Sequence, residues 1–255
     1  MMETREEAAR RIFGERAATY STSTAHTDPQ VLARVVELAS AHPHWSVLDI
    51  ATGTGHTAFA LAPFVHSVVG TDLTPEMLAE AERLRVVRGI ENVRFRPADV
   101  HHLPFEAETF DLVTCRRAAH HFSDIAVALC EMHRVVRRHG RLVIDDRSVP
   151  EDDFVDTCLN QLDRYHDESH VRQYRVSEWR TLLTTAGFAV EAVESYRKHR
   201  PLSAFTAGVA PQNVARIEAL LAKLTNAERA ALNLDEIDGE THLDHYYVLI
   251  AATKH

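Results

Sequence analysis

The stretch Val47-Leu-Asp-Ile-Ala-Thr-Gly-Thr-Gly-His56 constrains the fold of this chain more than any other. It begins as a short apolar run, which is typical of a buried parallel strand. Two glycines, Gly53 and Gly55, follow one residue apart, and residues 57–64 have the composition of a helix. Glycine tolerates a positive φ and has no Cβ. A strand, a glycine turn and a helix in this order therefore bring backbone close to a nucleotide-like ligand.

Asp49 separates two interpretations of this loop. Gly53-x-Gly55-x-x-Ala58 fits the dinucleotide fingerprint, but a carboxylate four residues before Gly53 would repel a pyrophosphate. S-adenosylmethionine carries a sulfonium and an ammonium and no phosphate. Asp49 can accept hydrogen bonds from the loop or, through water, from that ammonium. The loop therefore favours a positively charged adenosyl ligand.

Length and composition bound the class of protein. The 255 residues are 45% hydrophobic, which suits one large α/β domain. A net charge of −9 argues against a nucleic-acid partner, because phosphate contacts need a basic surface. No apolar run approaches the length of a membrane helix, and the charged residues 1–7 lack a signal-peptide core. The three cysteines have no metal-binding spacing, so we expect a cytoplasmic protein with reduced thiols and no metal.

Apolar segments that alternate with helical patterns predict a doubly wound parallel sheet. Two further strands are expected near the end of the chain, with helices before them. The strands are expected at 47–50, 66–72, 92–97, 110–115, 141–145, 188–193 and 243–253.

Two acids follow predicted strands and are candidate ligand contacts. Asp72 lies about 20 residues beyond the glycine loop, where a carboxylate can accept both hydroxyls of a ribose. Asp99 can accept a hydrogen bond from an adenine amino group, while Val100 covers a ring edge. The alternative for either acid is a simple turn or cap residue.

Several motifs taken together resemble a known family. They are the 47–55 stretch, Asp72, Ala98-Asp99, Leu103-Pro-Phe105, Phe110-Asp-Leu-Val113 and Glu131…Arg134-Val-Val…Gly140. Over residues 15–195 the chain resembles class I S-adenosylmethionine-dependent methyltransferases, in particular the ubiquinone/menaquinone-biosynthesis type (methyltransferase type 11). The resemblance implies an α/β, Rossmann-like, seven-stranded sheet, mostly parallel, with an antiparallel last strand beside the strand from 188. It also implies a single domain, 1–255, with a helical lid at 1–45, a cofactor-binding core at 46–146 and substrate-side elements at 147–255.

The resemblance also implies a set of cofactor-binding residues. The methionine-side loop, the ribose and adenine contacts, a following helix and the end of the fourth strand contribute to it: Asp49, Ala51, Thr52, Gly53, Gly55, Asp72, Leu73, Met77, Asp99, Val100 and Arg116. Tyr20, from the lid, is a candidate near the sulfonium. The sequence departs from the family pattern at Ala51, where a glycine is usual, and at Gly140-Arg141, where two glycines are usual.

The expected reaction is in-line transfer of a methyl group from S-adenosylmethionine to an O, N or C nucleophile of a small molecule, with S-adenosylhomocysteine as product. His120 and His121 follow the fourth strand, at the edge where substrates lie. We expect His121, and after it His120, to face the acceptor and remove its proton. The alternative is structural: one histidine packs on Phe122 and the other caps the helix that begins at Asp124.

Two other functions stay open on the sequence. An NAD(P)-dependent reductase would use Tyr-x-x-x-Lys, but the residues four after Tyr165, Tyr174 and Tyr196 are serine, glutamate and arginine. A protein that binds S-adenosylmethionine without catalysis would carry the same motifs, because a fold does not fix a function.

Overall fold

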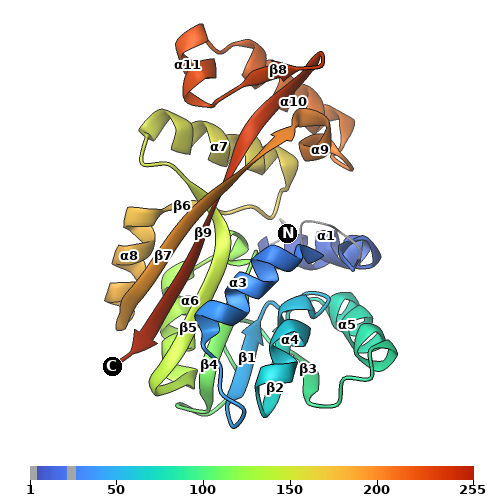
Figure 1. Ribbon diagram of the computed structural model, residues 1–255. Coiled ribbons are helices and arrows are strands. Elements are labelled where there is room, and N and C mark those ends of the chain that lie inside the picture. Colours follow the sequence, from blue (N-terminus) through green and yellow to red (C-terminus); the bar gives the residue numbers. More distant parts are fainter. Residues whose placement is uncertain (1–4, 22–26) are drawn as a thin grey trace.

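The computed structural model describes residues 5–21 and 27–255 (Figure 1). One sheet runs through them, and seven of its strands lie in the order β3-β2-β1-β4-β5-β9-β7. Short strands β6 and β8 pair with β5 and β9. The strands are β1 (Ser46–Ile50), β2 (Ser67–Asp72), β3 (Val93–Pro97), β4 (Phe110–Arg116), β5 (Val136–Val149), β6 (Tyr174–Arg175), β7 (Phe188–Pro201), β8 (Asp235–Ile237) and β9 (Glu240–Lys254).

Strands β3, β2, β1, β4 and β5 are mutually parallel, and β9 is antiparallel to both neighbours. The predicted Rossmann-like sheet with an antiparallel last strand is confirmed. The chain moves outward from β1 to β3 and then returns to the other side of β1 for β4. This reversal opens a crevice at the carboxyl ends of β1 and β4, where doubly wound folds bind ligands.

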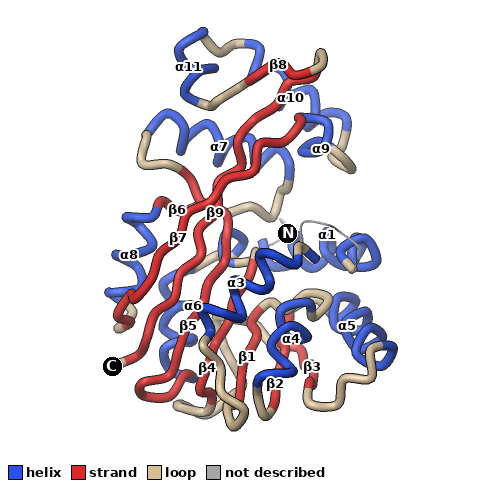
Figure 2. Tube along the Cα trace, viewed as in Figure 1, coloured by secondary structure: helices blue, strands red, loops and turns tan. Residues whose placement is uncertain are grey.

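Helices cover both faces of the sheet (Figures 1 and 2). Alternate residues of a strand point to opposite faces, so Leu48 belongs to one buried core and Val47 to the other. Each face is covered by its own helices, α6 and α8 on the Leu48 side and α3 and α4 on the Val47 side. The helices of this part are α3 (Pro29–Ala39), α4 (His56–Leu61), η1 (Ala62–Phe64), α5 (Pro75–Val87), η2 (Ala119–His121), α6 (Ile125–Val135) and α8 (Val176–Thr185).

Helix α1 (Arg5–Tyr20) lies against α5, above the carboxyl ends of the strands (Figure 1). Helix α3 begins as predicted: the Asp28 side chain accepts hydrogen bonds from the backbone N–H groups of Gln30 and Val31, and Pro29 is its first residue. The N-terminal helices expected from the sequence are therefore present. Their role as a lid stays a prediction.

The long strands β7 and β9 continue beyond the sheet into an upper part of the molecule (Figure 2). A third apolar core, which includes Val149, Leu159, Phe205, Ile217 and Leu243, holds this part together. Its helices are α7 (Asp153–His166), α9 (Leu202–Thr206), α10 (Pro211–Ala222) and α11 (Asn226–Ala231).

Strand β7 extends eight residues further than the sequence predicts. Residues 194–200 read Glu-Ser-Tyr-Arg-Lys-His-Arg and show no apolar alternation. They are strand because they pair with β9, from Glu194 opposite Leu249 to Pro201 opposite His242. A pattern within one segment does not report such a partner.

Candidate active site

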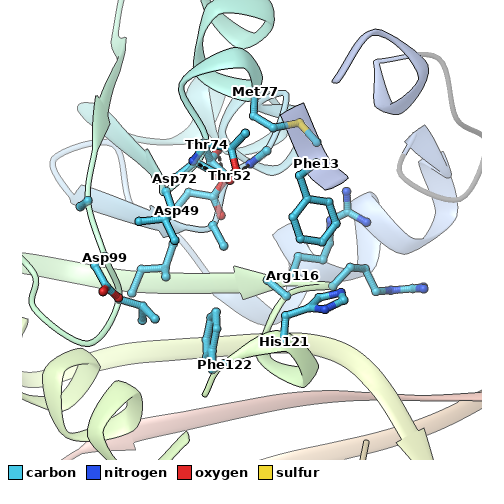
Figure 3. A pocket seen from close by; sticks show the side chains of 18 of the residues that line it. Phe13, Asp49, Thr52, Asp72, Thr74, Met77, Asp99, Arg116, His121 and Phe122 are labelled. Atoms are coloured by element: carbon cyan, nitrogen blue, oxygen red, sulfur yellow. Dashed lines mark hydrogen bonds between the residues drawn. The ribbon is translucent and has the colours of Figure 1, made fainter. Parts of the chain in front are cut away.

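A pocket lies at the carboxyl ends of β1, β2 and β4 and beside the turn that follows β3 (Figure 3). Helix α1 closes over it with Phe13. The pocket brings together most of the predicted site residues, from segments as far apart as residue 49 and residue 121. Those that line it are Asp49, Ala51, Thr52, Gly53, Asp72, Leu73, Met77, Asp99, Val100, Arg116 and His121.

Asp49 is buried beneath the glycine loop and fixes its first turn. It is 1% exposed, and its two carboxylate oxygens accept the hydroxyls of Thr52, at 2.6 Å, and Thr114, at 2.7 Å. Burial raises the pKa of Asp49 to about 6, against the lowering effect of these hydrogen bonds. The carboxylate therefore holds the first turn of the loop against β4. This is the first of the two roles expected from the sequence, namely to accept hydrogen bonds from the loop.

Three loop residues have positive φ: Ala51 at 49°, Gly53 at 54° and Gly55 at 87°. A Cβ on Gly53 would meet nothing within 4 Å, so this residue presents bare backbone to open space in the pocket. A Cβ on Gly55 would lie 2.9 Å from the rings of Phe59 and Phe95. Gly55 is thus needed for packing below the loop, and among the described residues it does not belong to the pocket lining.

Asp72, at the end of β2, ties the loop to the next strand. It accepts the N–H of Gly53 at 2.8 Å and that of Thr74 at 2.9 Å. Burial raises its pKa, although these backbone hydrogen bonds oppose the change. Each carboxylate oxygen has a second lone pair, so Asp72 can still accept hydrogen bonds from a ligand.

Asp99 follows β3 and is fixed by a histidine that sequence reasoning did not single out. One oxygen, Oδ1, accepts the backbone N–H of His101 at 2.9 Å and contacts the His101 ring at Nδ1, 2.7 Å away. The other nitrogen, Nε2, accepts the N–H of Asp124 at 3.3 Å. Nδ1 is therefore the protonated nitrogen. The second oxygen of Asp99 has no hydrogen-bond partner within 5–21 and 27–255, and so can accept from an adenine amino group.

Two arginines lie at the end of β4. Arg116 donates from Nε to the hydroxyl of Thr57, at 2.9 Å, and so reaches the start of α4. Arg117, which the sequence analysis did not propose, has a φ of 56°. Its guanidinium donates to Asp145 and to the hydroxyl of Tyr196. It also lies 3.8 Å from the ring centre of Tyr247, so its position is held from three sides.

The adjacent histidines have different environments. His120 is 7% exposed, and its Nδ1 lies 2.5 Å from Asp146 Oδ1. Burial holds the pKa of His120 well below its usual value. His121 lines the pocket, and its ring meets Phe13 edge to face with centroids 5.0 Å apart (Figure 3). Within the described chain, His120 does not belong to the lining.

Neither histidine caps the helix that begins at Asp124. The Asp124 side chain caps α6 itself by accepting the N–H of Val127, and its own N–H goes to His101. The side chain of Tyr20, the third catalytic candidate, lies outside the described residues. Phe13, Phe122 and His101 are among the lining residues that were not predicted. For Phe13 no local signal exists, since nothing in α1 marks which residue meets the pocket.

The described residues contain no cluster that could hold a metal ion. In the same part of the chain, no helix is long and apolar enough to cross a membrane.

The pocket offers open backbone and several hydrogen-bond acceptors to a ligand. Gly53 gives the open backbone, Asp72 and Asp99 give acceptors at successive strand ends, and Asp49 gives a buried negative charge for a cationic ligand. A pocket at the switch point of such a sheet is typical of the Rossmann-like folds that bind nucleotide-like ligands, a class that includes the Rossmann-like methyltransferases.

Comparisons with known proteins agree with that class. Residues 48–144 match a family model described as a methyltransferase domain. The uncharacterized methyltransferase YcgJ of Bacillus subtilis is 36% identical over 184 residues, which are 72% of this chain and 73% of that protein. The demethylmenaquinone methyltransferase of Thermus thermophilus is 45% identical over 114 residues, 44% of this chain and 51% of that enzyme. The chain belongs to the class I S-adenosylmethionine-dependent methyltransferases.

Solved structures show the same relationship. The crystal structure of YcgJ from Bacillus subtilis superposes with a TM-score of 0.83 at 31% identity, over 88% of this chain and 97% of that one. More distant structures share the fold alone. One of them is the [4+2]-cyclase SpnF, at 20% identity and a TM-score of 0.60, so this fold by itself does not imply methyl transfer.

Proposed function

We propose that this protein transfers a methyl group from S-adenosylmethionine to an O, N or C nucleophile of a small molecule and releases S-adenosylhomocysteine. The observation that carries the proposal is one continuous pocket. It runs from the acids that suit an adenosine, Asp72 and Asp99, to a half-buried histidine, His121, under α1. Bound S-adenosylmethionine supplies a methyl carbon that its sulfonium has already activated for in-line displacement.

The residues of the chain have separate tasks in this proposal. Asp72 accepts from the ribose, Asp99 from the adenine, and Leu73 and Val100 cover the ring. The loop from Ala51 to Gly53, held by Asp49, receives the methionine end of the ligand, with Thr52, Met77 and Arg116 around it. His121 removes the proton of the acceptor. His120, through its hydrogen bond with Asp146, fixes the turn that carries His121.

A small acceptor suits the net charge of −9 and the enclosed position of His121 under Phe13. Some relatives carry names that give an acceptor, such as demethylmenaquinone methyltransferase, and this chain spans about half of that enzyme. Quinols and phenols are therefore the first acceptors to try.

Calorimetric titration with S-adenosylmethionine, S-adenosylhomocysteine and NADH tests the cofactor. We expect micromolar binding of both adenosyl ligands and, in Asp72→Ala, a loss of about 10- to 100-fold, because hydrogen bonds to a charged group are worth about 1.5–3 kcal/mol. The exposed Asp235→Ala is the control. Binding of NADH alone would instead support an oxidoreductase.

Transfer of a labelled methyl group to a panel of quinols, phenols, primary amines and tertiary amines tests the reaction. Methylation of at least one acceptor, reduced at least 100-fold in His121→Ala at saturating acceptor, is the expected result. Tight cofactor binding without turnover on the panel would favour a non-catalytic binding protein.

A further inference from the structure

The hydroxyl of Ser169 and the carboxylate of Asp167 lie behind His121, on the side away from the pocket. Ser169 Oγ is 3.0 Å from His121 Nδ1 and 2.6 Å from Asp167 Oδ1. The backbone N–H of Ser169 also donates to Asp167 Oδ1, at 2.9 Å. Ser169 is fully buried and Asp167 is 8% exposed, so water does not compete for these contacts.

The protons in this chain of contacts can be assigned. A serine hydroxyl has one proton, and an ionised carboxylate only accepts. The short Ser169–Asp167 contact therefore uses the serine proton. The contact between Ser169 and His121 must then use the proton on Nδ1. In the neutral ring of His121, Nε2 carries no proton.

Asp167 is ionised in this arrangement. Burial raises its pKa, but His121, when it is protonated, and the two hydrogen bonds from Ser169 lower it more, and the net pKa lies below the usual value. An ionised Asp167 keeps the serine proton directed toward itself.

The segment that carries both residues is attached to the histidine turn. Beyond α7, the N–H groups of Val171 and Arg172 donate to the carbonyl of His120, at 2.9 and 3.2 Å. The ring of His121 is also confined by His120, with centroids 4.0 Å apart, and by Phe13. Because Nδ1 is bound to Ser169, Nε2 is the nitrogen left for the pocket. It has no hydrogen-bond partner in the described parts of the chain.

We propose that Asp167 and Ser169 are positioning residues that hold His121 in the Nδ1–H tautomer, so that Nε2 accepts a proton from an acceptor with a removable proton on its attacking atom. This inference rests on the proposed methyl transfer and narrows its acceptor to hydroxyl, protonated amine or activated carbon groups. The proton moves to Nε2, the electron pair it leaves forms the bond to the methyl carbon, and the pair of the broken carbon–sulfur bond stays on sulfur. The imidazolium then releases its proton to solvent.

The first test needs no acceptor. The ring nitrogens of the protein, labelled with ¹⁵N-histidine and saturated with S-adenosylhomocysteine, are observed by NMR, and His121→Gln identifies the signals of His121. We expect a protonated Nδ1 and a bare Nε2 in the wild type, and a mixture or a reversed tautomer in Ser169→Ala. A protonated Nε2 in the wild type overturns the proposal.

Ser177→Ala is a matched control. Ser177 donates its hydroxyl to Glu151 at 2.6 Å and its backbone N–H to the same carboxylate at 3.0 Å, the same pair of contacts at a distance from the pocket. We expect this variant to leave the His121 signals unchanged. Ser169→Thr, which keeps a hydroxyl, is expected to restore the wild-type tautomer.

Kinetics provide the second test. Ser169→Ala and Asp167→Asn should lower kcat about 5-fold, because a hydrogen bond of about 1 kcal/mol orients the base, with unchanged affinity for S-adenosylhomocysteine. Unchanged kcat together with an unchanged tautomer overturns the positioning role. If the panel yields only tertiary amines and their methylation is as fast in His121→Ala, the role of His121 as a base is overturned. If no acceptor is found at all, the proposed function fails while the NMR result still decides the tautomer.

Discussion

The carboxylate of Asp72 accepts the backbone N–H of Gly53 at 2.8 Å, across 19 residues of chain. This bond joins the end of β2 to the glycine loop after β1. The acid that is expected to bind a ribose therefore also fixes the backbone that we propose for the methionine end of the ligand. In that proposal, the two parts of the cofactor site are held together by this hydrogen bond.

Gly53 offers a direct test of that loop. Replacing it by alanine should cost about 1–2 kcal/mol of stability, because its φ of 54° is left-handed. The new methyl group would also stand in the open pocket. Gly239, in the turn between β8 and β9, has a φ of 78° and is equally free of neighbours. Gly53→Ala and Gly239→Ala should therefore lower Tm similarly, but only Gly53→Ala should weaken S-adenosylhomocysteine binding, by about 10-fold or more. Equal affinities of the two variants would place the ligand elsewhere.

Ala51 stands where the family pattern has a glycine, and its φ of 49° carries strain. We expect Ala51→Gly to stabilise the protein by up to about 1 kcal/mol, since relief of strain outweighs the added freedom of the unfolded chain. Ala215, exposed in the middle of α10, is the opposite case: Ala215→Gly should destabilise by about 1 kcal/mol. Urea denaturation measures both changes. A loss of stability in both variants would contradict the strain at Ala51.

The pKa of Asp49, raised to about 6 by burial, makes stability depend on pH. Between pH 4 and pH 6 the unfolded chain has lost this proton and the native protein keeps it, so Asp49 lowers the free energy of unfolding as pH rises through that window. Asp49→Asn removes the effect. The stability of the variant relative to the wild type should improve from pH 4.5 to pH 7.5, by at most about 3 kcal/mol. Urea denaturation at each pH measures the free energy of unfolding of both proteins. A difference between them that stays constant across this pH range would contradict the raised pKa.

His120 and His121 should respond differently to alanine. His120→Ala leaves the buried carboxylate of Asp146 without its ring partner, which should cost about 2–4 kcal/mol. His121 is only half buried, so His121→Ala should cost about 1 kcal/mol and act on turnover instead. Thermal unfolding of the two variants measures the difference. Equal losses of Tm would contradict a structural role that only His120 has.

His101 should matter to the ligand through Asp99. His101→Ala frees the Asp99 side chain that it holds at 2.7 Å, and we expect S-adenosylhomocysteine to bind about 3- to 10-fold more weakly, the loss of about 1 kcal/mol. The neighbouring His102 is exposed, so His102→Ala is the control with unchanged affinity. Titration calorimetry compares the two.

Much of the pocket lining could be predicted from the sequence because its signals are local. The apolar run at 47–50 and the glycines behind it specify a strand and a turn, whatever the remainder of the chain does. Asp72 and Asp99 could be named because parallel strands end at one edge of the sheet, so position along the chain predicts position in space.

The surroundings of the two histidines, His120 and His121, could not be predicted from the sequence and depended on tertiary structure. His120 and His121 are identical residues in one irregular turn, and no periodicity tells which of them is buried on Asp146 and which faces the pocket. Ser169 and Phe13 meet His121 from 48 residues further along the chain and from an N-terminal helix. The sequence by itself determined which strand ends and which turn form the pocket, since short-range sterics and burial periodicity act within a segment. Only packing between distant segments decided which histidine faces the pocket, because the orientation of a ring is set by what surrounds it.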